Sequence, residues 1–269
     1  MNAIRPITFD QFGSKRWRGA PDYRFAATAS IAPVAAAELA KAVHVYPLAF
    51  VEIEGSWSLV AVLGLKPGQN LFVAPSGKWA TSYIPAAFRS HPFRLARTEA
   101  GEYALCVDEA SGLVVDGTEG APFFDDSGRV TEGVSKVFDF LVQTARSREA
   151  TNAACATLAQ HGVIEPWPVK IQDGDQERQV GGLNRINETA LNGLSDDAFL
   201  ALRRAGALPI AYAQLLSMGN LATLGRLADL HRKAQAQIAA QAAATQNLDL
   251  DQVFSNNSTV DWSKLTGGQ

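Results

Sequence analysis

The sequence predicts an α+β protein, with an antiparallel or mixed sheet in the N-terminal half and a helical C-terminal part. Two apolar runs, residues 46–53 and 58–65, flank a short loop that contains Gly55, which is typical of a β-hairpin. After Thr131, apolar residues recur at the three- and four-residue spacing of a helix. Hydrophobic residues make up 47% of the 269 residues, which is enough to build a core.

Four segments are expected along the chain. They are an N-terminal arm (1–20), a mixed α/β body (21–175), a helical C-terminal part (176–240) and a flexible tail (241–269). We expect Phe9, Phe12 and Trp17 to pin the arm to the body. The tail is polar, with Phe254 and Trp262 as isolated aromatic residues, and such a composition does not build a core by itself.

The first half of the body is expected to be mostly β. The near-continuous hydrophobicity of the hairpin runs indicates central strands that are covered on both faces. A strand at residues 25–31 and a helix after Pro33 precede the hairpin in this prediction. Further strands are expected at residues 71–73, 93–97, 103–107 and 113–115.

Helices are expected to dominate from Thr131 onwards. A first helix is predicted to reach Arg148, and Thr151 or Asn152 to cap a second one that ends near residue 162. Residues 163–171 are expected to be extended. In the C-terminal part, the expected signals are Ser195 as an N-cap, Gly206 as a helix stop, Pro209 in a first turn and Asn220 as the cap of the last helix.

Charge and hydropathy exclude several classes of protein. The net charge of −3 provides no strong positive field for phosphate backbones, so nucleic acid is not an expected partner. Every apolar run is far shorter than the roughly 20 residues that span a bilayer, and charged residues and Pro6 interrupt the N-terminal run that a signal peptide needs. We therefore expect a soluble cytoplasmic protein without membrane insertion, in which Cys106 and Cys155 are reduced, buried and inert.

The sequence predicts no catalytic residue, no metal site and no cofactor. It contains no G-x-S-x-G nucleophile elbow, no phosphate-binding P-loop and no G-x-G-x-x-G dinucleotide motif. Its four histidines do not pair at ligand spacing, whereas a zinc site needs three or four ligands.

A cluster of aromatic and cationic residues is the candidate ligand-binding site. It comprises Trp79, Tyr83, Arg89 and His91, with Asp108 at the end of a predicted strand. Such a mixture is typical of a pocket for an aromatic or anionic group. The planar fork of Arg89 suits a carboxylate, so a peptide or an amino acid is the candidate ligand.

A structural interpretation of the same cluster stays open, and we favour it. The aromatic residues then pack in the core with a cationic rim, and Arg89 bonds backbone carbonyls to stabilise the local bend. His91 is then a surface turn residue, and Asp108 belongs to a solvated turn.

An ordered series of short segments resembles the SapC family of bacterial proteins. Among them are G-Q-N-L-F-V at residues 68–73, R-S-H-P-F at residues 89–93 and I-A-Y-A-Q-L-L-S at residues 210–217. The other similar segments are residues 46–48, 63–65, 77–79, 83–86, 106–108, 120–124, 181–183, 187–188 and 206–208, with Leu191. The resemblance covers most of residues 22–230.

The resemblance implies a non-enzymatic accessory or interaction protein linked to surface-layer or peptide and nutrient-transport systems. It implies a protein partner, leaves a homo-oligomer open and carries over no catalytic residue. Related genes lie near those for outer-membrane receptors and flavin-dependent halogenase-like proteins. The alternative that this implies is a small-molecule- or peptide-binding protein, or an enzyme partner, with a pocket near residues 79–94.

Overall fold

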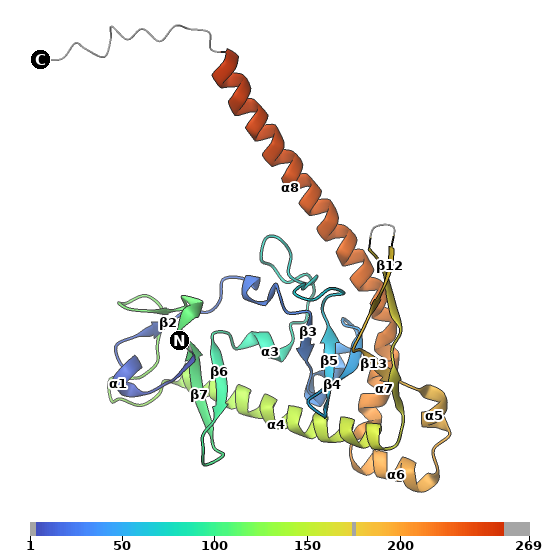
Figure 1. Ribbon diagram of the computed structural model, residues 1–269. Helices are drawn as coiled ribbons and strands as arrows, with labels where there is room; N and C mark the ends of the chain where they lie inside the picture. Colours follow the sequence, from blue (N-terminus) through green and yellow to red (C-terminus); the bar gives the residue numbers. More distant parts are fainter. Residues whose placement is uncertain (1–3, 174–175, 256–269) are drawn as a thin grey trace, which may run out of the picture. The chain divides into compact units, whose positions relative to one another are not determined.

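The computed structural model describes residues 4–173 and 176–255, and the side chains of residues 4–170 and 179–241. It confirms the α+β class, with antiparallel sheets in the N-terminal half and helices in the C-terminal part (Figure 1). The chain divides into two compact units, Met1–Leu227 and Ala228–Gln269. In the second unit, the structure describes residues 228–255, which continue the helix α8 (Leu221–Ser255). The four predicted segments remain a prediction, and residues 256–269 of the predicted tail lie outside the described residues.

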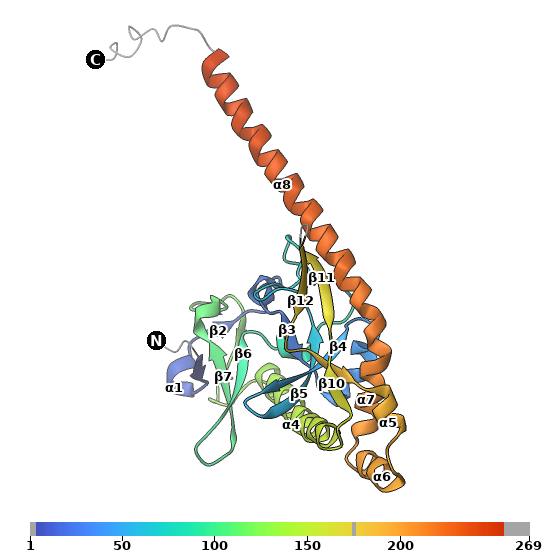
Figure 2. The ribbon, with the colours of Figure 1, turned by 45° about the vertical axis from the view of Figure 1, so that its right-hand side comes forward.

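A five-stranded antiparallel sheet is the centre of the first unit. Its strands, in spatial order, are β10 (Ile164–Pro166), β13 (Asn184–Ile186), β4 (Leu48–Ile53), β5 (Ser56–Val62) and β3 (Ile31–Pro33). Figure 2 shows β10 beside the central strands. The predicted hairpin is confirmed as β4 and β5, whose turn places Glu54 at φ 51° and Gly55 at φ 75°. Two central turn residues with positive φ match the right-handed twist of paired strands.

Three smaller sheets complete the β structure. One has the order β1-β7-β6, another β8-β2-β9, and the third pairs β11 with β12. Their bounds are β1 (Ile4–Pro6), β6 (Phe93–Arg97), β7 (Tyr103–Asp108), β2 (Arg16–Trp17), β8 (Val114–Val115), β9 (Ala121–Pro122), β11 (Val169–Asp173) and β12 (Gln176–Val180). The strands predicted at residues 93–97, 103–107 and 113–115 are therefore confirmed.

The helix α4 (Glu132–Gln160) joins the two main β regions. It packs against β5 and against β6, and it passes beneath both in Figure 1. The other helices and turns are α1 (Phe9–Phe12), α2 (Leu39–Ala42), α3 (Ala86–Arg89), α5 (Glu188–Asn192), α6 (Asp196–Arg204) and α7 (Ala207–Ser217), with the 3-10 turns η1 (Arg24–Ala26), η2 (Ala36–Glu38), η3 (Glu109–Ser111) and η4 (Met218–Asn220). Ser195 caps α6 as predicted, since its hydroxyl accepts the Ala198 N–H at 3.4 Å, and Gly206 ends that helix at φ 66°.

Two helices were expected between Thr131 and residue 162, and this expectation is wrong. α4 is one helix of 29 residues. The Thr151 hydroxyl donates to the Ser147 carbonyl at 2.7 Å and accepts the Ala36 N–H at 2.8 Å. A threonine that bonds back to the preceding turn stays inside a helix and does not cap a new one.

The predicted strand at residues 25–31 is also wrong, because Asn70 binds the backbone there. Its side-chain amide donates to the Ala26 carbonyl at 3.0 Å, and its N–H donates to the Ala27 carbonyl at 2.8 Å. The segment therefore forms η1 and reaches the sheet only at Ile31. The Asn70 side chain also accepts the Phe72 N–H at 3.0 Å, and residues 71–73 form one isolated bridge, Val73 with Trp79, in place of the predicted strand.

Further differences concern the ends of the first unit. Residues 4–17 form β1, α1 and β2, and Phe12 is buried in a core cluster with Phe93 and Phe123. β12 and β13 lie within residues 176–240, so this segment is not wholly helical. The Asn220 amide donates to the Val43 and Tyr46 carbonyls at 2.7 and 3.1 Å, so it ties η4 to the segment that follows α2, and its role as the cap of the last helix stays a prediction.

Candidate functional site

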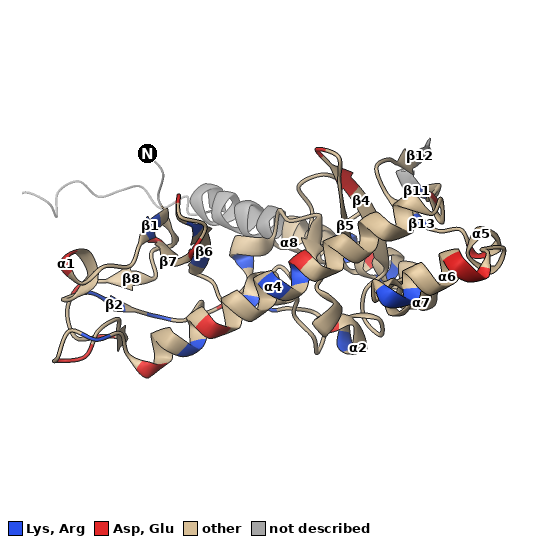
Figure 3. Cartoon of the chain, turned by 90° about the horizontal axis from the view of Figure 1, so that it is seen from below, with Lys and Arg blue, Asp and Glu red and all other residues tan. Residues whose placement is uncertain are grey.

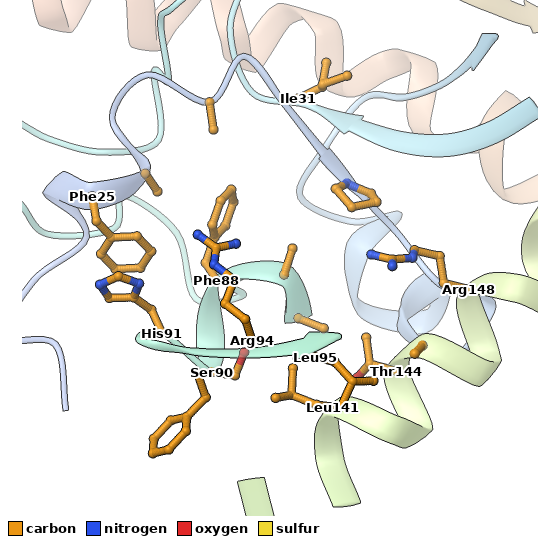
Figure 4. A pocket seen from close by; sticks show the side chains of 17 residues that line it. Phe25, Ile31, Phe88, Ser90, His91, Arg94, Leu95, Leu141, Thr144 and Arg148 are labelled. Carbon is orange, nitrogen blue, oxygen red and sulfur yellow. The ribbon is translucent and has the colours of Figure 1, made fainter. Parts of the chain in front are cut away.

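A pocket of about 470 Å³ lies between η1, α3, β6 and α4 (Figure 4). One wall is aromatic: the Phe25 and His91 rings stack with centroids 3.9 Å apart and an interplanar angle of 11°. Phe88 meets the same Phe25 ring edge-on at 6.3 Å. Leu95 from β6 and Leu141 from α4 add aliphatic surface. The pocket is therefore largely apolar, as small-molecule sites usually are.

Two arginines line this pocket from different elements. Arg94 comes from β6 and Arg148 from α4, which pack against each other. Figure 3 marks Lys and Arg positions on both elements. Neither guanidinium has a hydrogen-bond or salt-bridge partner among the described residues. No Asp or Glu is among the lining residues. The pocket thus combines apolar walls with two exposed guanidinium groups that form no ion pair within the described part of the chain.

His91 lines the pocket, and its surroundings favour the neutral imidazole. Burial lowers its pKa below the usual 6.5, the nearby Arg94 lowers it further, and Asp108 partly opposes this shift. Desolvation and a neighbouring like charge both disfavour the imidazolium. His91 therefore adds an aromatic face to the pocket, and its charged form is disfavoured there.

Trp79 is half-buried and lines neither this pocket nor the smaller one described below. Its indole N–H donates to the Tyr46 hydroxyl at 3.0 Å, and that hydroxyl donates to the Tyr83 carbonyl. Burial raises the pKa of Tyr46 to about 12. The Trp79 ring also stacks on Phe72, with centroids 6.2 Å apart. These contacts hold the loop before α3 in place.

Tyr83 and Arg89 meet at a buried carboxylate. The Tyr83 hydroxyl donates to Glu38 Oε1 at 2.8 Å, and burial together with this bond raises the pKa of Tyr83. The Arg89 guanidinium donates to the Tyr83 hydroxyl at 3.4 Å, lies 3.9 Å from Glu38 and sits over the Tyr83 and Phe140 rings. The Arg89 guanidinium therefore already has partners within the protein, in contrast to those of Arg94 and Arg148.

Arg89 and His91 are brought together in a second, smaller pocket of about 270 Å³. It shares Phe88 and Ser90 with the larger pocket, so the segment from α3 to β6 is a wall between them. Asp108 lines neither pocket: its Oδ1 accepts the Ala110 N–H at 3.1 Å at the start of η3. The role of these five residues in ligand binding remains a prediction.

Sequence reasoning did not single out Phe25 and Arg148 as site residues. They come from η1 and α4, which are far apart in the chain. One signal was present, because Leu141, Thr144 and Arg148 follow the spacing of one helix face. That face becomes a pocket wall only once β6 is known to pack against it.

The fold and the site define an α+β protein with an arginine-bearing apolar pocket. The model of the SapC family matches residues 7–224, so the chain belongs to the SapC family. No curated protein and no solved structure matches it. In the part of the chain that the structure describes, no helix is long and apolar enough to cross a bilayer, and no group of three metal-ligating side chains is present.

Proposed function

We propose that this SapC-family protein is a non-enzymatic accessory protein of a surface-layer or peptide and nutrient-transport system, and that it binds an apolar carboxylic acid. The observation that carries the binding role is the pair of unpaired guanidinium groups on an aromatic pocket without acidic residues. The family membership supports the accessory role. Free, buried Cys106 and Cys155 fit the cytoplasmic location that we include in the proposal.

The pocket suits an apolar acid in three ways. Its volume lies within the range of about 300–1,000 Å³ that is usual for small ligands. Apolar surface that Phe25, Phe88 and Leu141 cover contributes roughly 25 cal/mol per Å². A guanidinium group binds a carboxylate through two parallel hydrogen bonds, which fixes the orientation of the ligand.

Calorimetric titration with 4-phenylbutyrate and its neutral amide tests this proposal. We expect the acid to bind and the amide to bind at least tenfold more weakly, because a charge-assisted hydrogen bond contributes about 1.5–3 kcal/mol. At least one of Arg94→Gln and Arg148→Gln should weaken binding of the acid, because its carboxylate binds one of the two guanidinium groups. Arg146→Gln is the matched control, since Arg146 is exposed on α4 and does not line the pocket. Equal binding of acid and amide, or no binding of either, would contradict the proposal.

An apolar patch supports a protein partner as a second element of the accessory role. Tyr212 and Leu216 lie one turn apart on α7, and their residues are 44% and 77% exposed. Large exposed apolar residues on neighbouring turns are typical of interaction surfaces. A Leu216→Asp variant should keep its melting temperature and lose the proteins that co-purify with the wild type. An unchanged set of co-purified proteins would argue against this patch.

A further inference from the structure

We infer that the ligand of the larger pocket carries two separated anionic groups at the ends of an apolar body. This inference rests on the proposed function and names the ligand class of the same site. It depends on where the two guanidinium groups lie, on what lies between them and on which carboxylates of the protein are already occupied.

The two guanidinium groups lie on different sides of the pocket. In Figure 4, Arg94 lies beside Phe88 and His91, and Arg148 enters from α4 at the other side. Apolar side chains, among them Leu95 and Leu141, line the space between these elements. Both arginines are exposed, so each can form charge-assisted hydrogen bonds with a ligand without prior desolvation. A single carboxylate therefore binds one of them, whereas an anionic group at each end of an apolar body binds both.

The surrounding carboxylates of the protein already bind other groups, which leaves the two arginines of the pocket for an anionic ligand. Glu149 is next to Arg148, but its carboxylate is bound by Arg97 and by the Tyr103 hydroxyl at 3.0 Å. Glu38 is buried and accepts the Tyr83 hydroxyl and backbone N–H groups. Neither carboxylate lines the pocket or forms an ion pair with Arg94 or Arg148.

The same arrangement selects against ligands with an ammonium group. No acidic side chain lines either the larger pocket or its smaller neighbour. An ammonium group buried there would lack an anionic partner and would lie near Arg94 or Arg148, which repel it. Free amino acids and the amino ends of peptides therefore fit this site worse than acids without an amino group. The candidate ligands are therefore narrowed from the peptides and amino acids that the sequence suggested to acids without a free amino group.

A chain-length series of α,ω-dicarboxylates tests the inference. Unbranched diacids of four to twelve carbons are titrated into the full-length protein, each beside its monomethyl ester, which keeps the apolar body and one carboxylate. We expect affinity to peak at one length, and the best diacid to bind at least tenfold more tightly than its ester. Arg94→Gln or Arg148→Gln should reduce the diacid to about the affinity of its ester, and Arg146→Gln should leave both ligands unchanged.

The outcomes separate this inference from the proposed function. If esters and diacids bind equally, and binding still depends on Arg94 and Arg148, the two-anion inference is overturned and the carboxylate site stands. If no diacid and no ester binds, both the two-anion inference and the proposed carboxylate site are wrong. A second comparison uses phenylalanine and N-acetylphenylalanine: tighter binding of the zwitterion would overturn the claim that the pocket rejects an ammonium group.

Discussion

Replacing Glu38 by glutamine should destabilise the protein strongly, although the change adds no bulk. The carboxylate is only 6% exposed and accepts three hydrogen bonds, from Ala35 N–H at 3.0 Å, Tyr83 O–H at 2.8 Å and Ala86 N–H at 2.7 Å. The amide nitrogen of glutamine cannot accept a hydrogen bond. In either orientation of the glutamine side chain, this nitrogen therefore lies opposite at least one of the three donor groups. The loss of one charge-assisted bond and the weakening of the others cost about 2–4 kcal/mol.

Thermal unfolding followed by circular dichroism measures this effect. For a domain of this size each kcal/mol lowers the melting temperature by about 2–4 °C, so we expect a decrease of roughly 5–15 °C. Glu52→Gln is the matched control, because Glu52 lies exposed on β4 and should change the melting temperature by less than about 2 °C. If Glu38→Gln behaves like this control, the Glu38 carboxylate does not hold α3 and Tyr83 in place.

Four further predictions concern the same region and the Cys155 thiol. Arg94→Gln should raise the pKa of His91 in an NMR titration, and an unchanged pKa would contradict the electrostatic account of the pocket. Because the folded pKa of His91 lies below its usual 6.5, the unfolded chain binds the proton first, and this residue should lower stability as the pH falls below 6.5. Tyr46→Phe leaves the Trp79 N–H without its acceptor and should cost about 1–3 kcal/mol in urea unfolding; a stable variant would refute this. Burial raises the pKa of Cys155 to about 12, so the thiol should react with Ellman's reagent at pH 8 only after unfolding, and a fast native reaction would contradict its burial.

Local signals predicted the parts of the fold that local forces determine. The hairpin follows from two apolar runs around Glu54 and Gly55, and these neighbours alone specify the turn. Ser195 and Gly206 mark the ends of α6 in the same way, because caps act on the adjacent turn. Each of these predictions depends on residues within a few positions of one another.

The failed predictions depend on partners that are distant in the chain. The strand expected at residues 25–31 is lost to bonds from Asn70, which comes from a later loop. Threonine often caps helices, but the Thr151 hydroxyl accepts the Ala36 N–H and donates to the Ser147 carbonyl of its own helix. Thr151 is therefore an interior helical residue. Some of residues 79–94 line the larger pocket, and their role in binding stays a prediction; Arg148 joins this pocket from the facing helix, and only the packing of β6 against α4 brings it there.

A crystal structure of the protein with 4-phenylbutyrate tests the central claim most directly. The account predicts the phenyl group against Phe25 and Phe88, with a carboxylate oxygen about 3 Å from a guanidinium nitrogen of Arg94 or Arg148. A ligand that leaves this pocket empty, or whose carboxylate binds Arg89 in the smaller pocket, would contradict it.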